Sequence, residues 1–379
     1  MSCLPTSHKS ERIRQIFVAA VMTFAALSPI AIGATPVESV ENYGADYADI
    51  VTAANREGKV VVYSVTSAVP LLLEDFQKLY PGVKLEYHAL DTTPLYDRIV
   101  SESANGNTAD VVWSSAMDLQ IKLVSDGYAQ AYASPEASKL PGWAIWRNEA
   151  FGTTSEPVGL VYNKRLLAAH EVPHDRAALM RLLKSQPTRF GNKVVAFDPE
   201  KSGLGYMLVT QDASVSPGSF RELTRTLGAA KVRLGSGSGA MFSLLGSGEA
   251  IIGYNLLGSY ASGRAKKDLP DLGVVLPNDY TLVMSRIMFI TKKASHPNAA
   301  KLWLDYVLSK RGQEIIAKSD LGSIRSDVDG DMTLAGLGKR LGNALKPIAV
   351  GPGLLGFIDP KKRAEFLGDW KASLGGAGK

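Results

Sequence analysis

The chain has 379 residues, of which 45% are apolar and 21% are charged, and its net charge is +5 at pH 7. This composition suits one large or two medium globular domains, and so mild and dispersed a positive excess excludes a strongly basic nucleic-acid-binding surface. The single cysteine is Cys3, so the chain beyond it offers neither a disulfide nor a thiolate ligand for a metal.

Residues 1–34 have the order of a secretory signal: a basic start, an apolar run from Ile16 to Gly33 that is broken by Pro29, and small residues before Thr35. We predict cleavage after Ala34 and export to the periplasm. An uncleaved N-terminal anchor is the alternative, but the proline and the small residues favour cleavage. Loss of this segment lowers the net charge to +3, which is compatible with an anionic ligand without requiring one.

The chain after the signal begins with alternating helices and strands. The expected elements are a helix at 45–57, a strand at 59–63, a helix at 69–76, a strand at 83–87, a helix at 96–104, a strand at 110–113 and a helix at 118–126. The strands are β-branched runs and the helices show a 3.6-residue apolar period. Repetition of this order predicts a parallel sheet covered by helices.

Two extended segments, 153–162 and 280–290, are interpreted as crossings between two lobes. Between them we expect a helix at 176–184, strands at 193–197, 232–234, 250–254 and 274–276, and helices from 206 and at 240–245. Helices at 299–308 and 312–319 follow, and the chain from Asn343 onward is expected to be a loose tail apart from a helix near 363–367.

The predicted architecture is therefore a two-lobed α/β fold, each lobe a mostly parallel sheet flanked by helices, with a central cleft. Residues 45–152 and about 286–330 form the N-terminal lobe, residues 163–280 the C-terminal lobe, and residues 331–379 C-terminal helices and tail. In open parallel sheets, ligands bind outside the carboxyl ends of the strands.

Five polar turns are expected at those strand ends: 64–67, 114–118, 198–206, 235–239 and 254–260. A hydroxyl-rich turn before a helix offers backbone N–H groups and a positive dipole end to an anion. Taken alone, such a turn is better explained as a helix cap, but several on one cleft form a polar cradle. The candidate ligand-binding residues are Ser64, Thr66, Ser67, Tyr96, Ser114, Ser115, Asp118, Ser202, Gly203, Tyr206, Ser238, Asn255, Tyr260 and Arg286.

Five segments carry a resemblance to a known family. They are K-V-V-V-Y-S (59–64), P-G-V-K-L-E-Y (81–87), A-D-V-V-W-S-S-A-M-D (109–118), V-G-L-V-Y-N (158–163) and S-H-P-N-A-A-K-L-W-L-D-Y-V-L-S (295–309). Over roughly Glu57 to Leu321 the chain resembles the bacterial extracellular solute-binding proteins (family 1) of ABC importers. Within them it resembles the receptors for ferric iron, hexose phosphates, phosphoglycerate and phosphonates. The resemblance implies a type II periplasmic binding fold that closes on a solute, performs no chemistry and delivers it to an inner-membrane permease.

The nature of the solute depends on the segment 248–260. The iron-binding members carry two adjacent tyrosines here, whereas this chain has Tyr254 and Tyr260 apart from each other. Because ferric iron needs hard oxygen donors such as phenolates, the serine-rich turns and Arg286 favour a phosphorylated or carboxylated organic anion. A ferric receptor, an exported enzyme and a periplasmic sensor partner remain alternatives. We expect a monomer without cofactor, metal or nucleic-acid partner.

Several candidates have a structural alternative. Ser238 is expected to cap the helix that follows a cleft-facing glycine-rich loop, although that loop could be a flexible linker. Tyr206 could close over a ligand or pack in the core, and Asp118 could be a helix-start charge. Arg286, on an apolar strand, should be paired or face the ligand. The H-E-V-P-H sequence at 170–174 matches a zinc-protease motif formally, but Pro173 breaks the helix that such a site needs.

Overall fold

The computed structural model describes residues 43, 45–67, 69–106, 108–319 and 321–375. They belong to one unit, Glu38–Lys379, whereas the expected signal sequence, residues 1–34, lies outside the described residues. None of the described helices is both long enough and apolar enough to cross a membrane.

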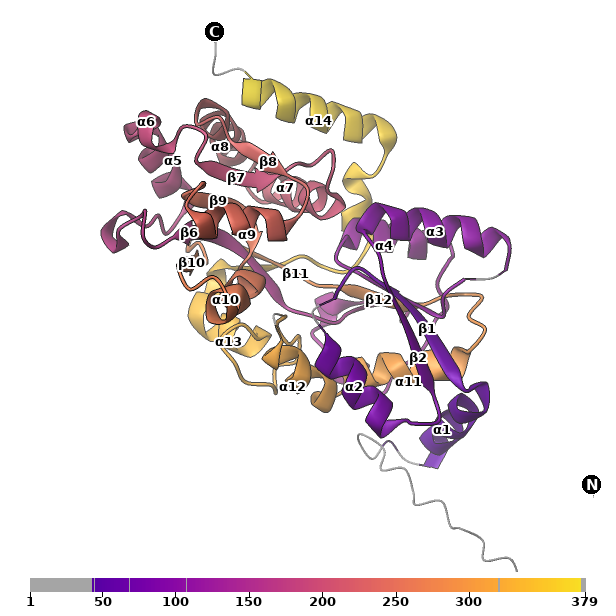
Figure 1. The fold of residues 1–379 in the computed structure, drawn as a ribbon. Helices are drawn as coiled ribbons and strands as arrows, with labels where there is room; N and C mark the ends of the chain where they lie inside the picture. The colour runs from indigo at the N-terminus through magenta and orange to yellow at the C-terminus, as the bar shows by residue number, and fades with distance from the viewer. Residues whose placement is uncertain (1–42, 44, 68, 107, 320, 376–379) are drawn as a thin grey trace, which may run out of the picture. The chain divides into compact units, whose positions relative to one another are not determined.

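The described helices and strands follow one another along the chain as expected for a mixed α/β fold (Figure 1). The helices are α1 (Ala45–Glu57), α2 (Pro70–Leu79), α3 (Thr92–Ala104), α4 (Met117–Ser125), α5 (Arg176–Ser185), α6 (Pro187–Phe190), α7 (Gly203–Val215), α8 (Pro217–Ala229), α9 (Ser238–Ser247), α10 (Gly258–Lys267), α11 (Pro297–Leu308), α12 (Lys310–Lys318), α13 (Leu334–Leu341) and α14 (Pro360–Gly375). The strands are β1 (Lys59–Ser64), β2 (Lys84–Ala89), β3 (Val111–Ser114), β4 (Ile145–Trp146), β5 (Ala150–Gly152), β6 (Glu156–Asn163), β7 (Val194–Phe197), β8 (Arg233–Gly235), β9 (Ile252–Leu257), β10 (Leu272–Val275), β11 (Thr281–Met284), β12 (Ile287–Ile290) and β13 (Leu345–Pro347).

The described strands form two sheets. The first has the order β2-β1-β3-β12-β5-β4, in which β2, β1 and β3 run parallel and β12, β5 and β4 pair antiparallel. Strand β1 is covered on both faces, because Val60 and Val62 pack into one hydrophobic cluster and Tyr63 into another. This double burial explains its continuous β-branched run.

The second sheet repeats the parallel pattern of the first. Its order is β13-β11-β6-β9-β7-β8, and β10 pairs with β6. Strands β8, β7 and β9 run parallel, as β2, β1 and β3 do in the first sheet, while β6 pairs antiparallel with β9, β10 and β11. Each parallel trio therefore sends its carboxyl ends and the following turns to one edge, where a ligand site is expected.

Two short connections join the sheets. Residues 153–155 link β5 to β6, and residues 285–286 link β11 to β12. The second expected crossing, 280–290, is thus two strands in different sheets with a break at Ser285–Arg286. The break coincides with the polar pair in the apolar run, where the backbone N–H of Arg286 donates to Thr154 Oγ1 at 2.8 Å. The expected lobe boundaries remain a prediction.

Several elements begin earlier than the apolar period suggested. Helix α7 starts at Gly203 instead of Tyr206, because Ser202 Oγ accepts a hydrogen bond from the Gly205 N–H at 3.0 Å and caps the helix there. Helix α3 starts at Thr92, within an expected loop. Asn255 lies in β9 and Tyr260 in α10, where a loop was expected.

Of the C-terminal prediction, the helix near 363–367 is present within α14, but the expectation that the rest of the segment is loose is wrong. Strand β13 extends the second sheet beside β11, and α14 is a 16-residue helix that packs on α8 (Figure 1). The contact rests on Phe220 of α8 and Trp370 of α14, both buried in one hydrophobic cluster. The sequence predicts only part of α14, because its aromatic residues Phe366 and Trp370 have their partners on α8, far away in the chain.

Candidate functional site

A pocket of about 620 Å³ lies between the turns of the two sheets. We call it the cleft pocket. It is lined by Val65, Leu90, Asp91, Thr92, Thr93, Pro94, Ser115, Phe197, Lys201, Ser202, Leu204, Ser236, Gly237, Ser238, Gly239, Leu257, Tyr260 and Arg286. Its volume falls in the range of small-molecule sites, roughly 300–1,000 Å³.

Helix N-termini dominate the wall of the cleft pocket. Among the described elements, α3, α7, α9 and α10 each place their N-cap or first-turn residues on it. Each is at least ten residues long, so each presents a developed positive dipole end. Convergence of several such ends makes the pocket attractive to anions.

The wall from the second sheet adds hydroxyl donors. Ser236 and Ser238 flank Gly237, the N-cap of α9, which has no side chain to accept the first-turn N–H groups. Ser202 lines the same wall from the start of α7. Lys201 adds a cation, with its Nζ 3.5 Å from Asp198 Oδ2 and its side chain mostly exposed.

The wall from the first sheet is built by the start of α3 and by Ser115. Thr92 and Thr93 contribute hydroxyl groups, and Asp91, the N-cap of α3, makes no capping hydrogen bond with its side chain. The two walls come close at Gly203, where an added Cβ would lie 3.0 Å from Thr92 Oγ1. A larger residue than glycine there would require the Thr92 side chain to shift by a few tenths of an ångström.

Arg286 lies at the junction of the two sheets and also lines the cleft pocket. Its Nε and Nη2 donate to Glu156 Oε1 and Oε2 at 2.8 and 3.0 Å, and both side chains are buried. Thr154 Oγ1 donates to Glu156 Oε1 at 2.8 Å. The Arg286 guanidinium is therefore paired with a carboxylate and also lies at the pocket. The sequence analysis expected one or the other of these two arrangements.

The structure brings only part of the predicted set together. The candidates that line the cleft pocket are Ser115, Ser202, Ser238, Tyr260 and Arg286. Tyr260 is held edge-on to Phe242, with ring centroids 5.3 Å apart. Ser238 is the first residue of α9 and not its N-cap, which is Gly237.

The turn after β1 uses its polar groups internally. Ser64 Oγ accepts from the Thr66 N–H at 3.1 Å, and the Thr66 carbonyl accepts from the Tyr87 hydroxyl at 2.7 Å. Both side chains are buried, so Val65 faces the pocket in their place. Ser114 is likewise buried and accepts from the Ala116 N–H at 3.2 Å. Ser67 lies beside Tyr260 on a neighbouring hollow.

Three more candidates face away from the cleft pocket. The Tyr206 hydroxyl donates to the Phe357 carbonyl at 2.7 Å, and the Arg363 guanidinium lies 3.9 Å above its ring. Asp118 is buried on α4, and burial raises the pKa of its carboxyl to about 6. Tyr96 packs half-buried against the core. The C-terminal segment, expected to be loose, is what covers Tyr206.

Asn255 has an unusual backbone. Its φ is +60° within β9, in the left-handed region that few side chains other than asparagine and glycine adopt. Its side-chain amide nitrogen is buried without a hydrogen-bond partner in the described part of the protein. Such strain and an unpaired donor two residues before Leu257 of the pocket wall are typical of functional sites.

The tyrosines of β9 and α10 do not form a pair. The Tyr254 hydroxyl donates to Asp212, and burial raises the pKa of the Tyr254 phenol well above its ordinary value. Arg176 and Tyr280 complete this buried network beneath the sheet. A search of the described residues finds no group of three or more His, Cys, Asp or Glu side chains placed to hold a metal ion.

Sequence reasoning missed several residues of the cleft pocket, including Val65, Thr92, Thr93 and Lys201. The turn after β2 carried a usable signal, because Asp91, Thr92 and Thr93 follow a strand as directly as the serines after β1 do. Nothing in the sequence distinguished hydroxyls that face a pocket from those that bond to their own backbone.

Comparison with known proteins places this geometry in context. The family model described as bacterial extracellular solute-binding protein matches residues 64–314. The structure is similar to the substrate-binding protein of an ABC transporter from Agrobacterium tumefaciens, with a TM-score of 0.78 and 36% identity over 83% of this chain and 94% of that chain. No curated protein matches the sequence significantly.

Two less similar structures share the fold. AfuA from Actinobacillus pleuropneumoniae with fructose 6-phosphate bound has a TM-score of 0.67 and 19% identity over 84% of this chain and 98% of that chain. Iron-bound HitA from Pseudomonas aeruginosa has a TM-score of 0.65 and 18% identity over 83% of this chain and 99% of that chain. At this identity they support the fold and not the ligand.

Proposed function

This chain belongs to the bacterial extracellular solute-binding proteins, and from that premise we propose that it captures a small anionic organic solute in the cleft pocket. As a member of that family it is a solute-binding component of an ABC transporter, a role that implies a periplasmic location and a membrane permease as partner. The proposal concerns the solute: a phosphorylated or carboxylated compound, delivered to an inner-membrane permease after hinge closure.

The observation that carries the proposal is the convergence of α3, α7, α9 and α10 N-termini on one pocket that also contains Arg286. Backbone N–H groups, serine and threonine hydroxyls and a guanidinium are the donors that phosphate and carboxylate oxygens accept from. Because Glu156 already neutralises Arg286 and Asp198 pairs with Lys201, the helix ends supply most of the uncompensated positive potential.

An acidic residue on the wall from the first sheet favours an organic solute over a bare inorganic anion. Asp91 lines the cleft pocket and is exposed, with no capping bond from its side chain. A carboxylate repels an anionic group but accepts hydrogen bonds from hydroxyl or amino groups. A solute that carries both an acid group and hydroxyl or amino groups could use both: the acid group would accept hydrogen bonds at the helix N-termini, and the hydroxyl or amino groups would donate to Asp91.

The donor set argues against ferric iron as the solute. The Tyr254 phenol is held by Asp212, and Tyr206 is covered by the C-terminal segment, so Tyr260 is the tyrosine that lines the pocket among the described residues. One phenolate and one carboxylate on opposite walls are a poor set for a hard trivalent cation.

The two short connections between the sheets support the proposal of hinge closure. The connections 153–155 and 285–286 are short, and the Arg286–Glu156 pair joins them. A ligand that contacts both walls stabilises the arrangement in which they approach, so its binding free energy favours the closed form. The permease would recognise that form.

The test is calorimetric titration of the protein purified without refolding, after native mass spectrometry has identified any co-purified molecule. Fructose 6-phosphate serves as the probe, with fructose as the matched neutral control and ferric citrate as the metal control. We expect the phosphate ester to bind at least tenfold more tightly than fructose, a difference of about 1.4 kcal/mol. X-ray scattering should show compaction on binding.

Equal affinity for fructose and its phosphate would contradict the anionic solute, as would tight stoichiometric iron binding with a visible tyrosinate band. Turnover of the probe would identify an enzyme. Retention of unchanged solute with compaction supports the receptor.

A further inference from the structure

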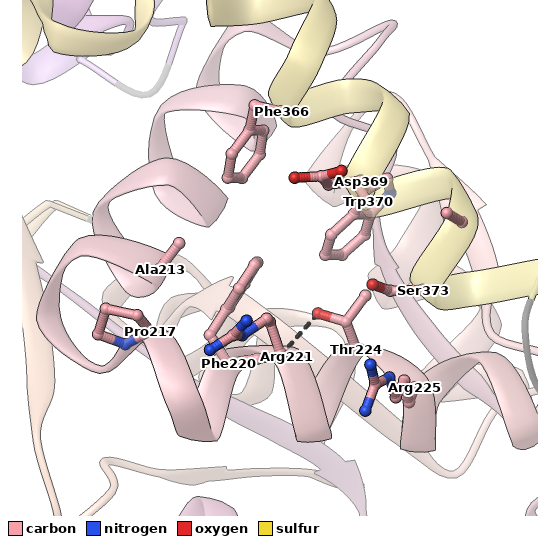
Figure 2. A pocket seen from close by; sticks show the side chains of 11 residues that line it. Ala213, Pro217, Phe220, Arg221, Thr224, Arg225, Phe366, Asp369, Trp370 and Ser373 are labelled. Carbon is pink, nitrogen blue, oxygen red and sulfur yellow. Dashed lines mark hydrogen bonds between the residues drawn. The ribbon is translucent and has the colours of Figure 1, made fainter.

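A second cavity, slightly larger than the cleft pocket, lies between α8 and α14. Its volume is about 690 Å³, and it shares no residue with the cleft pocket. We call it the α8–α14 pocket. Figure 2 shows its floor and sides: residues of α8 lie on one side and residues of α14 on the other, with open space between them.

The pocket is preformed by the packing of the two helices. An added Cβ on Gly228 of α8 would lie 2.3 Å from the Leu374 carbonyl oxygen of α14, so the backbones touch at this end. Trp370 and Phe220 are buried where the helices meet. The space beside them is therefore a fixed feature of the surface, in the volume range of ligand sites.

Flat apolar surfaces form one part of the α8–α14 pocket. The rings of Phe220 and Trp370 are stacked with centroids 5.9 Å apart and planes 26° apart, and those of Phe220 and Phe366 with centroids 6.2 Å apart and planes 23° apart. Phe220 and Trp370 are themselves buried, so the half-buried Phe366 presents the aromatic surface at the opening, against which another flat ring can pack.

Two arginines form the other part. Arg221 and Arg225 are one helical turn apart on α8, so their side chains lie on the same face, and both are exposed. Within the described residues neither has an ion-pair partner. Thr224 between them is already engaged, since its Oγ1 donates to the Phe220 carbonyl at 2.8 Å. Asp369 of α14 lies across the opening (Figure 2), so the lining carries more positive than negative charge.

We propose that the α8–α14 pocket is a second ligand site, separate from the cleft pocket, and that it binds a flat aromatic anion such as an aromatic carboxylate or sulfonate. The ring of the ligand packs against Phe366 at the edge of the Phe220–Trp370 stack, and its acid group accepts from Arg221 and Arg225. Guanidinium groups next to apolar surface bind oxyanions in planar, paired hydrogen bonds more strongly than ammonium groups do. Neither half alone makes the site: the rings lack polar specificity, and two exposed arginines alone are ordinary surface charge.

The test uses 1-naphthoate in calorimetric titration, with acetate as the anion without a ring and 1-naphthalenemethanol as the ring without a charge. We expect 1-naphthoate to bind with a dissociation constant below about 1 mM and both controls to bind at least tenfold more weakly, because a charge-assisted hydrogen bond or a stacked ring is worth about 1.4 kcal/mol or more. No binding of 1-naphthoate would overturn the proposal.

Variants locate the site. The double variant Arg221→Ala/Arg225→Ala should weaken 1-naphthoate at least tenfold, whereas Arg181→Ala, at an exposed arginine of α5, should leave binding unchanged. Asp369→Asn should strengthen it about twofold, since a nearby like charge is removed. Wild-type affinity in the double variant would mean that naphthoate binds elsewhere and would overturn the proposal.

Two further variants test whether lost binding reflects unfolding of α8 and whether the ligand lies next to α14. Arg221→Gln/Arg225→Gln removes both charges but keeps polar side chains that favour a helix, so loss of binding in it with an unchanged melting temperature excludes unfolding of α8. Trp370→Phe keeps a ring and should retain most of the affinity while abolishing the ligand-dependent change in tryptophan fluorescence. Persistence of that change would place the ligand away from α14 and contradict the assignment.

Discussion

The turns of the two sheets carry similar residues but use them differently. After β1 and β3, Ser64 and Ser114 are buried and accept hydrogen bonds from their own turns. After β8, Ser236 and Ser238 flank a glycine N-cap and line the cleft pocket. Ser64 and Ser114 therefore stabilise their own turns, whereas Ser236 and Ser238 turn their donors to the cleft pocket, as Ser115 does after β3.

The helices that follow the turns reinforce the difference. Helix α2 begins with Pro70, which has no backbone N–H, so its N-terminus offers fewer donors to a ligand. Helix α9 begins with Ser238 after Gly237 and keeps its first-turn N–H groups without a side-chain cap. A hydroxyl-rich turn therefore offers most donors where the helix behind it keeps its first-turn N–H groups open, as α9 does, although Ser202 lines the pocket while capping α7. Substitutions that separate stability from affinity test this distinction.

The largest effect is expected for Arg286→Ala, because Arg286 both stabilises the fold through its ion pair and lines the cleft pocket. Its loss leaves Glu156 buried without its partner, which should lower the free energy of unfolding by about 3–5 kcal/mol. Solute affinity should fall as well, since the guanidinium lines the cleft pocket. Chemical denaturation and calorimetry measure the two effects.

A double variant divides these roles. In Glu156→Leu/Arg286→Met the buried charges are replaced by apolar side chains of similar size, which is often neutral for stability. We expect the free energy of unfolding to recover and the affinity to stay low. Recovery of both would show that Arg286 acts only through the fold, and the anion would then be held by the helix ends alone.

The second effect concerns Asp118 in the first turn of α4, the helix that follows β3. Burial raises the pKa of its carboxyl from 3.8 to about 6, with Arg363 opposing the change. The folded state therefore binds the proton more tightly than the unfolded state, and the free energy of unfolding falls as pH rises between about 4 and 6. Above that window Asp118→Asn should stabilise the protein by up to about 3 kcal/mol, and at pH 4 by much less.

Urea denaturation at pH 4 and pH 7.5 measures this change, and the remaining pH dependence should come from groups such as Asp305, whose pKa burial raises to about 7. Solute affinity at pH 7.5 should not change, because Asp118 does not line the cleft pocket. A tenfold loss of affinity in Asp118→Asn would instead support the ligand contact that the sequence predicts.

Much of the fold could be predicted because its signals are local. The helix at 45–57 and the strand beginning at Lys59 have the expected bounds or nearly so, since apolar periodicity and a terminating glycine determine them over a few residues. The order of such elements was enough to indicate two sheets. The C-terminal helix was underestimated because the apolar residues that seat it, Phe366 and Trp370, have their partners on α8, far away in sequence.

The site was predictable in kind but not in detail. Arg286 could be singled out, since a charge on an apolar strand needs a partner, but Glu156 lies 130 residues away and its pairing leaves no local trace. Whether a hydroxyl bonds to its own turn depends on angles within that turn, which Ser64 and Ser238 do not reveal by residue type. Tyr206 was ambiguous for the same reason, because the segment that covers it arrives from the far end of the chain.

The smallest effects come from Ser64→Ala and Ser238→Ala, and this pair tests the distinction between the turns most directly. Ser64→Ala leaves the buried Thr66 N–H without its acceptor, which should cost about 1–2 kcal/mol of stability and leave affinity unchanged. Ser238→Ala removes a hydroxyl from the wall of the cleft pocket and no hydrogen bond found within the described protein. Its stability should stay within about 0.5 kcal/mol of wild type, and its affinity should fall severalfold, a loss of about 1 kcal/mol. If Ser64→Ala reduced affinity as much as Ser238→Ala does, the turn after β1 would take part in binding, and the difference between the turns after β1 and β8 would not hold.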